Sequence, residues 1–185
     1  GGGFESREKM EKAGKCIDDF AEGICSLLNE LNYNPTLMLE PGRYIVNDAA
    51  ICIGTLVSKK KNWNNDWWIT DMGTNLLLPF GGREFDILPL RREQLTEVCV
   101  NVGDRSSSFS GVIKRNAMIC NQEIGDQIAA INCGSYTFSC AQNFMYPLNY
   151  SFILVDENDF RLIHKSKSEE QRIDELFLEK NCEGE

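Results

Sequence analysis

The chain has 185 residues, which is enough to bury one good hydrophobic core or two small ones. Its formal net charge is −9, and its acidic residues are scattered without a basic stripe, so nucleic acid is a poor partner. Apolar runs stay below the ~20 residues of a membrane-spanning helix, and no signal-peptide pattern opens the sequence. We therefore expect a cytoplasmic protein without a membrane partner.

Cysteine and histidine usage limits the chemistry further. The eight cysteines lie inside apolar stretches and form no Cys-x-x-Cys pair, which predicts buried free thiols in a reducing compartment. The single histidine, His164, leaves little for a Ser-His or Cys-His hydrolase. Ligand spacing typical of zinc sites is missing, so no metal is expected.

The chain opens with Gly1, Gly2 and Gly3. Such a run is either the remnant of a tag or a loop whose backbone N–H groups bind phosphate at the start of a helix. A helical pattern does follow, because apolar residues recur at three- and four-residue spacing from Met10 to Leu31. We predict one continuous amphipathic helix there.

A short apolar run and a turn come next. Residues 36–39 have no polar interruption after the threonine, which predicts a strand buried on both faces in an α/β barrel. Pro41 and Gly42 end this strand, so Glu40 and Arg43 lie on the loop at its carboxyl end, where barrel enzymes carry their chemistry. The alternative is a surface Pro-Gly turn with a solvated ion pair.

Beyond Tyr44 the hydrophobic period changes from helical to extended. We predict strands over residues 45–57, 67–70, 76–78, 97–102, 112–119, 127–131, 152–155 and 160–163. Many short strands with regular turns favour a β-barrel or sandwich, and the run of lysines at 59–61 is assigned to a solvated turn. The domain boundary is expected near residue 46, giving domains 1–45 and 46–185. Ser168 and Gln171 have capping-box spacing, which predicts a closing helix over about 168–180.

The motif Glu40-Pro41-Gly42-Arg43, followed by Tyr44-Ile45-Val46, resembles the second half of the fold-type III pyridoxal-phosphate decarboxylases, the diaminopimelate and ornithine decarboxylase group. Further segments in the family's order are Gly1–Phe4, Asp71–Asn75, Gly125-Asp126, Gly134–Tyr136, Asn143-Phe144, Arg161–Ile163 and Ile173–Phe177. The resemblance covers essentially the whole chain. It implies an α/β plus β fold: the C-terminal piece of an alanine-racemase-like (β/α)8 barrel, then an all-β barrel or sandwich domain with a C-terminal helix.

The resemblance also implies a pyridoxal 5'-phosphate cofactor, an amino-acid substrate and a homodimer with shared active sites. The residues expected around the cofactor phosphate are Gly1, Gly2, Gly3, Glu40, Gly42 and Arg43. Arg43 would also hold a substrate carboxylate, because guanidinium favours bidentate pairing. Tyr136 falls on the tyrosine of the family's Gly-Ala-Tyr motif, where its hydroxyl would reach the cofactor. The alternative for Tyr136 is an aromatic side chain packed in the core.

One departure from the family concerns the start of the chain. In the family, the lysine that forms the Schiff base and the residue that pairs with the cofactor's ring nitrogen lie in segments that this sequence does not contain. The lysine lies upstream of the glycine loop. We therefore expect an N-terminal barrel portion as a partner of this chain, which would be a fragment, a cleavage product or one half of a split protein.

Two further departures concern the substrate. Many diaminopimelate decarboxylases have an Arg-Pro pair at the position where this chain has Leu78-Pro79, which Phe80 follows. Leucine cannot pair with a carboxylate. A pocket with Leu78, Phe80 and Ser107 would take a substrate less charged at its far end. The family's catalytic cysteine aligns near Ser106, a much weaker acid than a thiol. Cys120 is the nearest cysteine, and it is expected in the core of a later strand.

We predict a pyridoxal-phosphate-dependent amino-acid decarboxylase that does not act on diaminopimelate itself. The alternatives are a catalytically weakened paralogue that binds a protein partner, an amino-acid racemase on the same cofactor, and a stand-alone β-domain binding module. Decarboxylation is favoured because Glu40, Arg43 and Tyr136 are all present.

Overall fold

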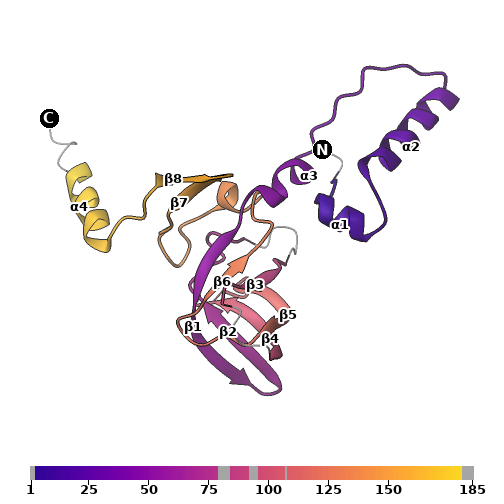
Figure 1. Ribbon diagram of the computed structural model, residues 1–185. Helices are drawn as coiled ribbons and strands as arrows, with labels where there is room; N and C mark the ends of the chain where they lie inside the picture. Colours follow the sequence, from indigo (N-terminus) through magenta and orange to yellow (C-terminus); the bar gives the residue numbers. More distant parts are fainter. Residues whose placement is uncertain (1–2, 79–83, 92–95, 107, 181–185) are drawn as a thin grey trace. The chain divides into compact units, whose positions relative to one another are not determined.

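The computed structural model describes residues 3–78, 84–91, 96–106 and 108–180, with side chains described up to residue 177. The chain forms two compact units, Gly1–Met145 and Tyr146–Glu185, and Figure 1 gives the path of the chain through each. No helix within these described ranges is long and apolar enough to cross a membrane. The expected domain boundary near residue 46 stays a prediction.

Two helices begin the first unit, α1 (Arg7–Lys12) and α2 (Ile17–Glu30). The prediction of one continuous helix is therefore wrong, because the chain turns at Gly14, which has a left-handed φ of +65°. Gly14 N–H donates to Glu11 O at 2.9 Å and Lys15 N–H donates to Met10 O at 2.9 Å, which is the Schellman pattern of a helix end. The apolar spacing continues through this break, so periodicity alone did not show it.

The prediction of a buried strand at 36–39 is also wrong. This segment is extended but pairs with no strand among the described residues, and Met38 is 83% exposed. A barrel strand is buried only when neighbouring strands cover it, and the strands of this chain pair elsewhere.

A helical turn, α3 (Arg43–Val46), and the 3-10 helix η1 (Asn47–Ala49) replace the extended structure predicted from residue 45. The carbonyl of Gly42 accepts hydrogen bonds from the N–H groups of Ile45 and Val46. The peptide after the glycine therefore coils before the first strand begins.

The sheet of the first unit is mixed and nearly closed. Its strands are β1 (Cys52–Asn62), β2 (Asn65–Thr70), β3 (Ile87–Pro89), β4 (Glu97–Asp104), β5 (Val112–Cys120) and β6 (Gln127–Ala130). They lie in the order β3-β6-β1-β2-β4-β5, with β2 and β4 parallel and the other pairs antiparallel (Figure 1). Phe85 N–H, just before β3, donates to Ile113 O on β5 at 3.1 Å, which brings the two edges of the sheet together.

The core lies inside this curved sheet. Leu56, Val102, Ile113 and Ile128, from four different strands, are each at most 1% exposed, and Trp68 packs with them. Burying each of these side chains contributes roughly 1.5–3 kcal/mol. The predicted all-β domain is confirmed by this sheet.

Most predicted strands exist, with three local errors. Residues 76–78 form a turn, because the N–H groups of Leu76 and Leu77 both donate to Gly73 O. The lysines at 59–61 lie on β1, not in a turn, and the connection to β2 is only Trp63 and Asn64. The three-residue strand β3 was not predicted, since Pro89 interrupts its pattern.

The second unit contains the hairpin of β7 (Phe152–Asp156) and β8 (Asp159–His164), then α4 (Glu169–Lys180). All three elements agree with the sequence predictions. The capping box at the start of α4 is present, because Gln171 N–H donates to Ser168 Oγ at 3.1 Å and Ser168 N–H donates to Gln171 Oε1 at 2.9 Å.

The seven described cysteines are free thiols, as predicted, but the expected burial is wrong for three of them. Cys16, Cys25 and Cys99 are exposed, whereas Cys133 is buried and Cys120 is half-buried on β5. Cys16 precedes α2 as its N-cap and Cys25 lies on α2, which buries none of its residues, whereas Cys99 occupies an outward-facing position of β4.

Candidate functional site

Two predicted motifs that are far apart in sequence meet beside α3. A side-chain carbon added at Gly42 would lie 3.5 Å from Tyr136 Oη. The guanidinium carbon of Arg43 lies 5.7 Å from the centre of the Tyr136 ring, within the range of a cation–π contact. The structure thus brings together the Pro-Gly-Arg turn and the Gly-Ser-Tyr segment.

The position of Tyr136 is imposed by the two residues before it. Gly134 N–H donates to Asn47 O at 2.9 Å, and Ser135 Oγ donates to Asn47 Oδ1 at 2.9 Å. Tyr136 itself has a left-handed φ of +53°, which is unfavourable for an aromatic residue. The ring is 41% exposed, which overturns the alternative of a core aromatic.

Arg43 has an ionic partner that the sequence reasoning missed. Its Nη1 donates to Glu5 Oε1 at 2.5 Å, and both side chains are only partly exposed. The pairing uses one atom of each group, since Arg43 Nε and Glu5 Oε2 are buried and have no hydrogen-bond partner within the described part of the chain. The only sequence signal for this contact was an acid two residues after Gly3, at the end of the glycine run.

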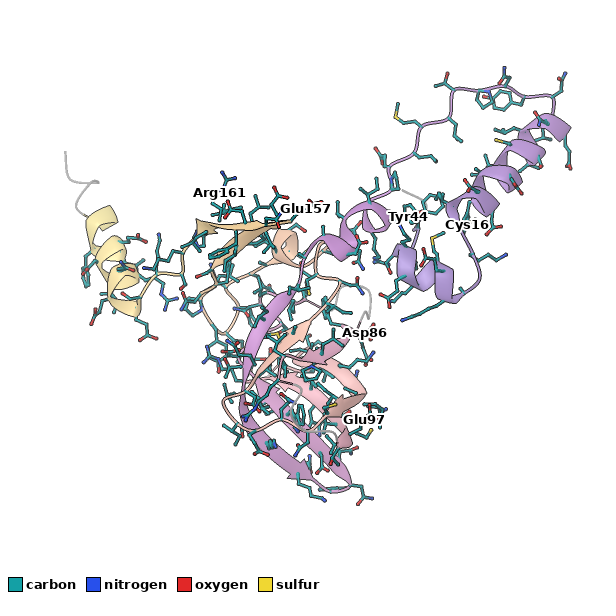
Figure 2. All side chains as sticks on the ribbon, in the orientation of Figure 1. Cys16, Tyr44, Asp86, Glu97, Glu157 and Arg161 are labelled. Atoms are coloured by element: carbon teal, nitrogen blue, oxygen red, sulfur yellow. The ribbon has the colours of Figure 1, made fainter. Side chains whose placement is uncertain are left out.

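Side chains near Glu5 hold helix α1 against the rest of the first unit. Glu8 accepts hydrogen bonds from Lys12 at 2.6 Å and from Asn132 at 3.0 Å, and these two bonds lower the pKa of Glu8. Arg7 lies 5.8 Å from the ring centre of Tyr44, which Figure 2 shows between α3 and α1. A shallow polar cleft here is lined by Glu5, Ser6, Glu8, Lys9, Asn47 and Asp86.

Ser106 lies in the loop between β4 and β5, which is organised by the buried carboxylate of Asp104. Ser106 donates to Asp104 Oδ1 from its N–H at 2.8 Å and from its hydroxyl at 2.6 Å. Thr74 donates to Asp104 Oδ2 from its N–H at 2.8 Å and its hydroxyl at 3.0 Å. The Ser106 proton is therefore engaged by a carboxylate in this structure.

The other predicted site residues divide into two groups. Gly3 is exposed with a left-handed φ of +69°, Glu40 is exposed, and Leu78 is half-buried. Gly1, Gly2, Phe80 and Ser107 lie outside the described residues. The roles predicted for both groups stay predictions.

Comparisons with known proteins find diaminopimelate decarboxylases as relatives of this chain. No family model matches the chain. A diaminopimelate decarboxylase of Campylobacter jejuni is 27% identical over 184 residues, which cover 96% of this chain and 44% of that protein. One of Aquifex aeolicus is 23% identical over 170 residues, covering 91% of this chain and 40% of that protein. The chain is homologous to the diaminopimelate decarboxylases.

Solved structures of diaminopimelate decarboxylases share the fold. The Helicobacter pylori enzyme complexed with L-lysine superposes with a TM-score of 0.69 at 26% identity, over 86% of this chain and 40% of that one. The chain spans less than half the length of the curated relatives it matches. The expected fold class, the C-terminal part of the fold-type III decarboxylase fold with its β-domain, is confirmed, apart from the unformed strand at 36–39.

The residues beside α3 suit the phosphate of the cofactor that the sequence resemblance implies. Arg43 offers a cationic donor whose Nε–H has no hydrogen-bond partner among the described residues, and Gly42 leaves the space beside it free of a side chain. The donor set therefore fits an oxyanion. The carboxylate of Glu5, however, already lies on one edge of the guanidinium.

Proposed function

We propose that this chain is part of a pyridoxal-phosphate-dependent amino-acid decarboxylase, in which it supplies one side of the cofactor site and the β-domain. The homologues are decarboxylases, which supports that class of reaction in general. The observation that carries the proposal is the contact of Arg43 and Gly42 with Tyr136, because it unites the two motifs expected at the cofactor.

In this proposal Arg43 and the glycines at 1–3 bind oxyanion oxygens, and Glu40 lines the same loop. Pyridoxal phosphate supplies the electron sink for the reaction when it is bound. Tyr136 presents its hydroxyl beside the Pro-Gly turn, and its ring holds the Arg43 guanidinium through a cation–π contact. The lysine that carries the cofactor would come from the N-terminal barrel portion.

The substrate we propose is an amino acid with less charge at its far end than diaminopimelate. Leu78 offers no cation for a second carboxylate, and Phe80 and Ser107 would line the same pocket. Ser106 would stand at the position of the family's catalytic cysteine. A homodimer with shared active sites and a cytoplasmic location belong to the same proposal.

The Glu5–Arg43 pair favours a second candidate, a weakened paralogue that acts by binding a protein partner. An internal carboxylate on the guanidinium opposes binding of an external one. A racemase on the same cofactor is the third candidate. It would exchange the Cα proton without releasing carbon dioxide.

Borohydride reduction of the complete protein, followed by peptide mapping, tests the proposal. We expect a pyridoxyl group on a lysine upstream of Gly1, and carbon dioxide release from an amino acid in a substrate screen. Exchange of the Cα proton without gas release would instead identify the racemase. If no lysine is labelled even with added cofactor, the proposal fails and partner binding becomes the function to pursue.

A further inference from the structure

Glu5 stands where an external oxyanion would meet Arg43. Its Oε1 lies 2.5 Å from Arg43 Nη1, and the Arg43 side chain is only 22% exposed. Tyr136 covers one face of the guanidinium from 5.7 Å. A phosphate or carboxylate approaching this group therefore meets a negative charge first.

The pair is incomplete. Arginine and carboxylate groups pair best through two parallel hydrogen bonds. Among the described residues, Arg43 Nε and Glu5 Oε2 are both buried without a hydrogen-bond partner, so each group has hydrogen-bonding capacity that the pair does not use. A bidentate oxyanion would satisfy Arg43 better than Glu5 does.

Glu5 also has an alternative cation. Lys9 lies four residues further along, and its Nζ is 3.8 Å from Glu5 Oε2. Glu5 precedes α1 and follows Gly3, whose φ of +69° marks a turn in the backbone. A small rotation of the Glu5 side chain would let its carboxylate pair with Lys9 in place of Arg43, so the carboxylate would keep a cationic partner.

We propose that Glu5 is a displaceable internal ligand of Arg43, which an external oxyanion must move toward Lys9 before it can bind. Glu5 thereby sets how tightly the site binds phosphate or carboxylate. This inference rests on the proposed function in one respect, since Arg43 is taken as the oxyanion ligand. The oxyanion is either the cofactor phosphate or the substrate carboxylate.

The test measures thermal stabilisation of the complete protein by inorganic phosphate and, separately, by acetate. We expect Glu5→Gln to bind inorganic phosphate about tenfold more tightly than the unchanged protein, as expected from loss of one partly buried competing charge. Glu11→Gln, at an exposed acid on the helix α1 that follows Glu5, is the matched control and should bind as the unchanged protein does. Arg43→Gln should remove the binding in both backgrounds.

The two probes distinguish the sources. A gain for inorganic phosphate assigns the site to the cofactor, and a gain for acetate alone assigns it to the substrate. Glu5→Asp, which keeps the charge on a shorter side chain, is a second variant and should give an intermediate gain.

Equal phosphate affinity in Glu5→Gln and the unchanged protein would overturn the inference, and so would absence of binding in both. Borohydride labelling separates these results from the proposed function. A labelled lysine with unchanged phosphate affinity leaves the decarboxylase proposal standing, whereas an unlabelled protein removes it.

Discussion

The buried hydroxyl of Ser135 donates a hydrogen bond to the buried amide oxygen of Asn47 at 2.9 Å, and so joins the segment after β6 to the turn after α3. Asn47→Ala removes the buried amide that accepts this hydrogen bond, whereas its backbone carbonyl can still accept from Gly134 N–H. We expect Asn47→Ala to lower the free energy of unfolding by about 1–3 kcal/mol. Urea denaturation would measure this. Ser139→Ala, at an exposed serine nearby, should change stability by less than about 0.5 kcal/mol.

Gly134 allows the closest approach of these two segments. A side-chain carbon there would lie 1.7 Å from the carbonyl oxygen of Val46, which is inside the van der Waals limit for a backbone atom. Gly134→Ala should therefore move Tyr136 away from Arg43 and destabilise the protein by about 2 kcal/mol or more. Gly23→Ala is the control, because a side chain at Gly23 meets nothing within 4 Å on α2. That change should stabilise the protein by about 0.5–1 kcal/mol, and equal melting temperatures for the two variants would contradict the packing described here.

The buried carboxylate of Asp104 accepts four hydrogen bonds from Thr74 and Ser106. Asp104→Ala leaves those donors without an acceptor, and we expect a loss of about 3 kcal/mol, with the β4–β5 loop becoming a site of proteolysis. Asp66→Ala is a matched control, since the Asp66 side chain forms an exposed ion pair with Lys61 at 3.8 Å. Its loss should stay below about 1 kcal/mol. Denaturation curves and limited proteolysis would compare the two.

Burial, and then the nearby Cys133 and Asp71, raise the pKa of the Cys52 thiol to about 12. The folded protein therefore binds a proton that the unfolded chain begins to release near pH 8.5, the ordinary thiol value. The stabilisation is complete below about pH 8.5 and declines as the pH rises toward 12. We expect Cys52→Ala to show a flatter loss of stability across this range.

Alkylation with iodoacetamide gives an independent test of the burial and raised pKa of the Cys52 thiol. At pH 8 the exposed Cys99 should react well before Cys52, because only the thiolate attacks. Peptide mass spectrometry over a time course would show the order. Simultaneous modification of both cysteines would contradict the burial of Cys52.

The sequence was most informative where a motif demands a backbone conformation. Pro41-Gly42 predicted a turn, and the family resemblance placed Arg43 and Tyr136 at the same cofactor; these two residues do lie next to each other. The alternation of the β-strands was also sufficient to predict most of the sheet, because one buried face requires it.

Three features could not be predicted in this way. The apolar segment at 36–39 could be buried only between neighbouring strands, and the described residues provide none there, so the predicted strand does not form. The break at Gly14 lies within a continuous apolar stripe. Glu5 pairs with Arg43 across 38 residues, and no local rule relates two side chains that far apart.

The position of β3 has a consequence for the order in which the chain can fold. The chain after β2 continues to the opposite edge of the sheet, where β3 pairs with β6 and with no other described strand, and then returns to place β4 beside β2. Strand β3 therefore has no strand to pair with until residues 127–130 have been synthesised, whereas β1, β2, β4 and β5 can pair earlier. On the ribosome this β-domain closes late, and a nascent chain that ends before β6 exposes the edge of β1.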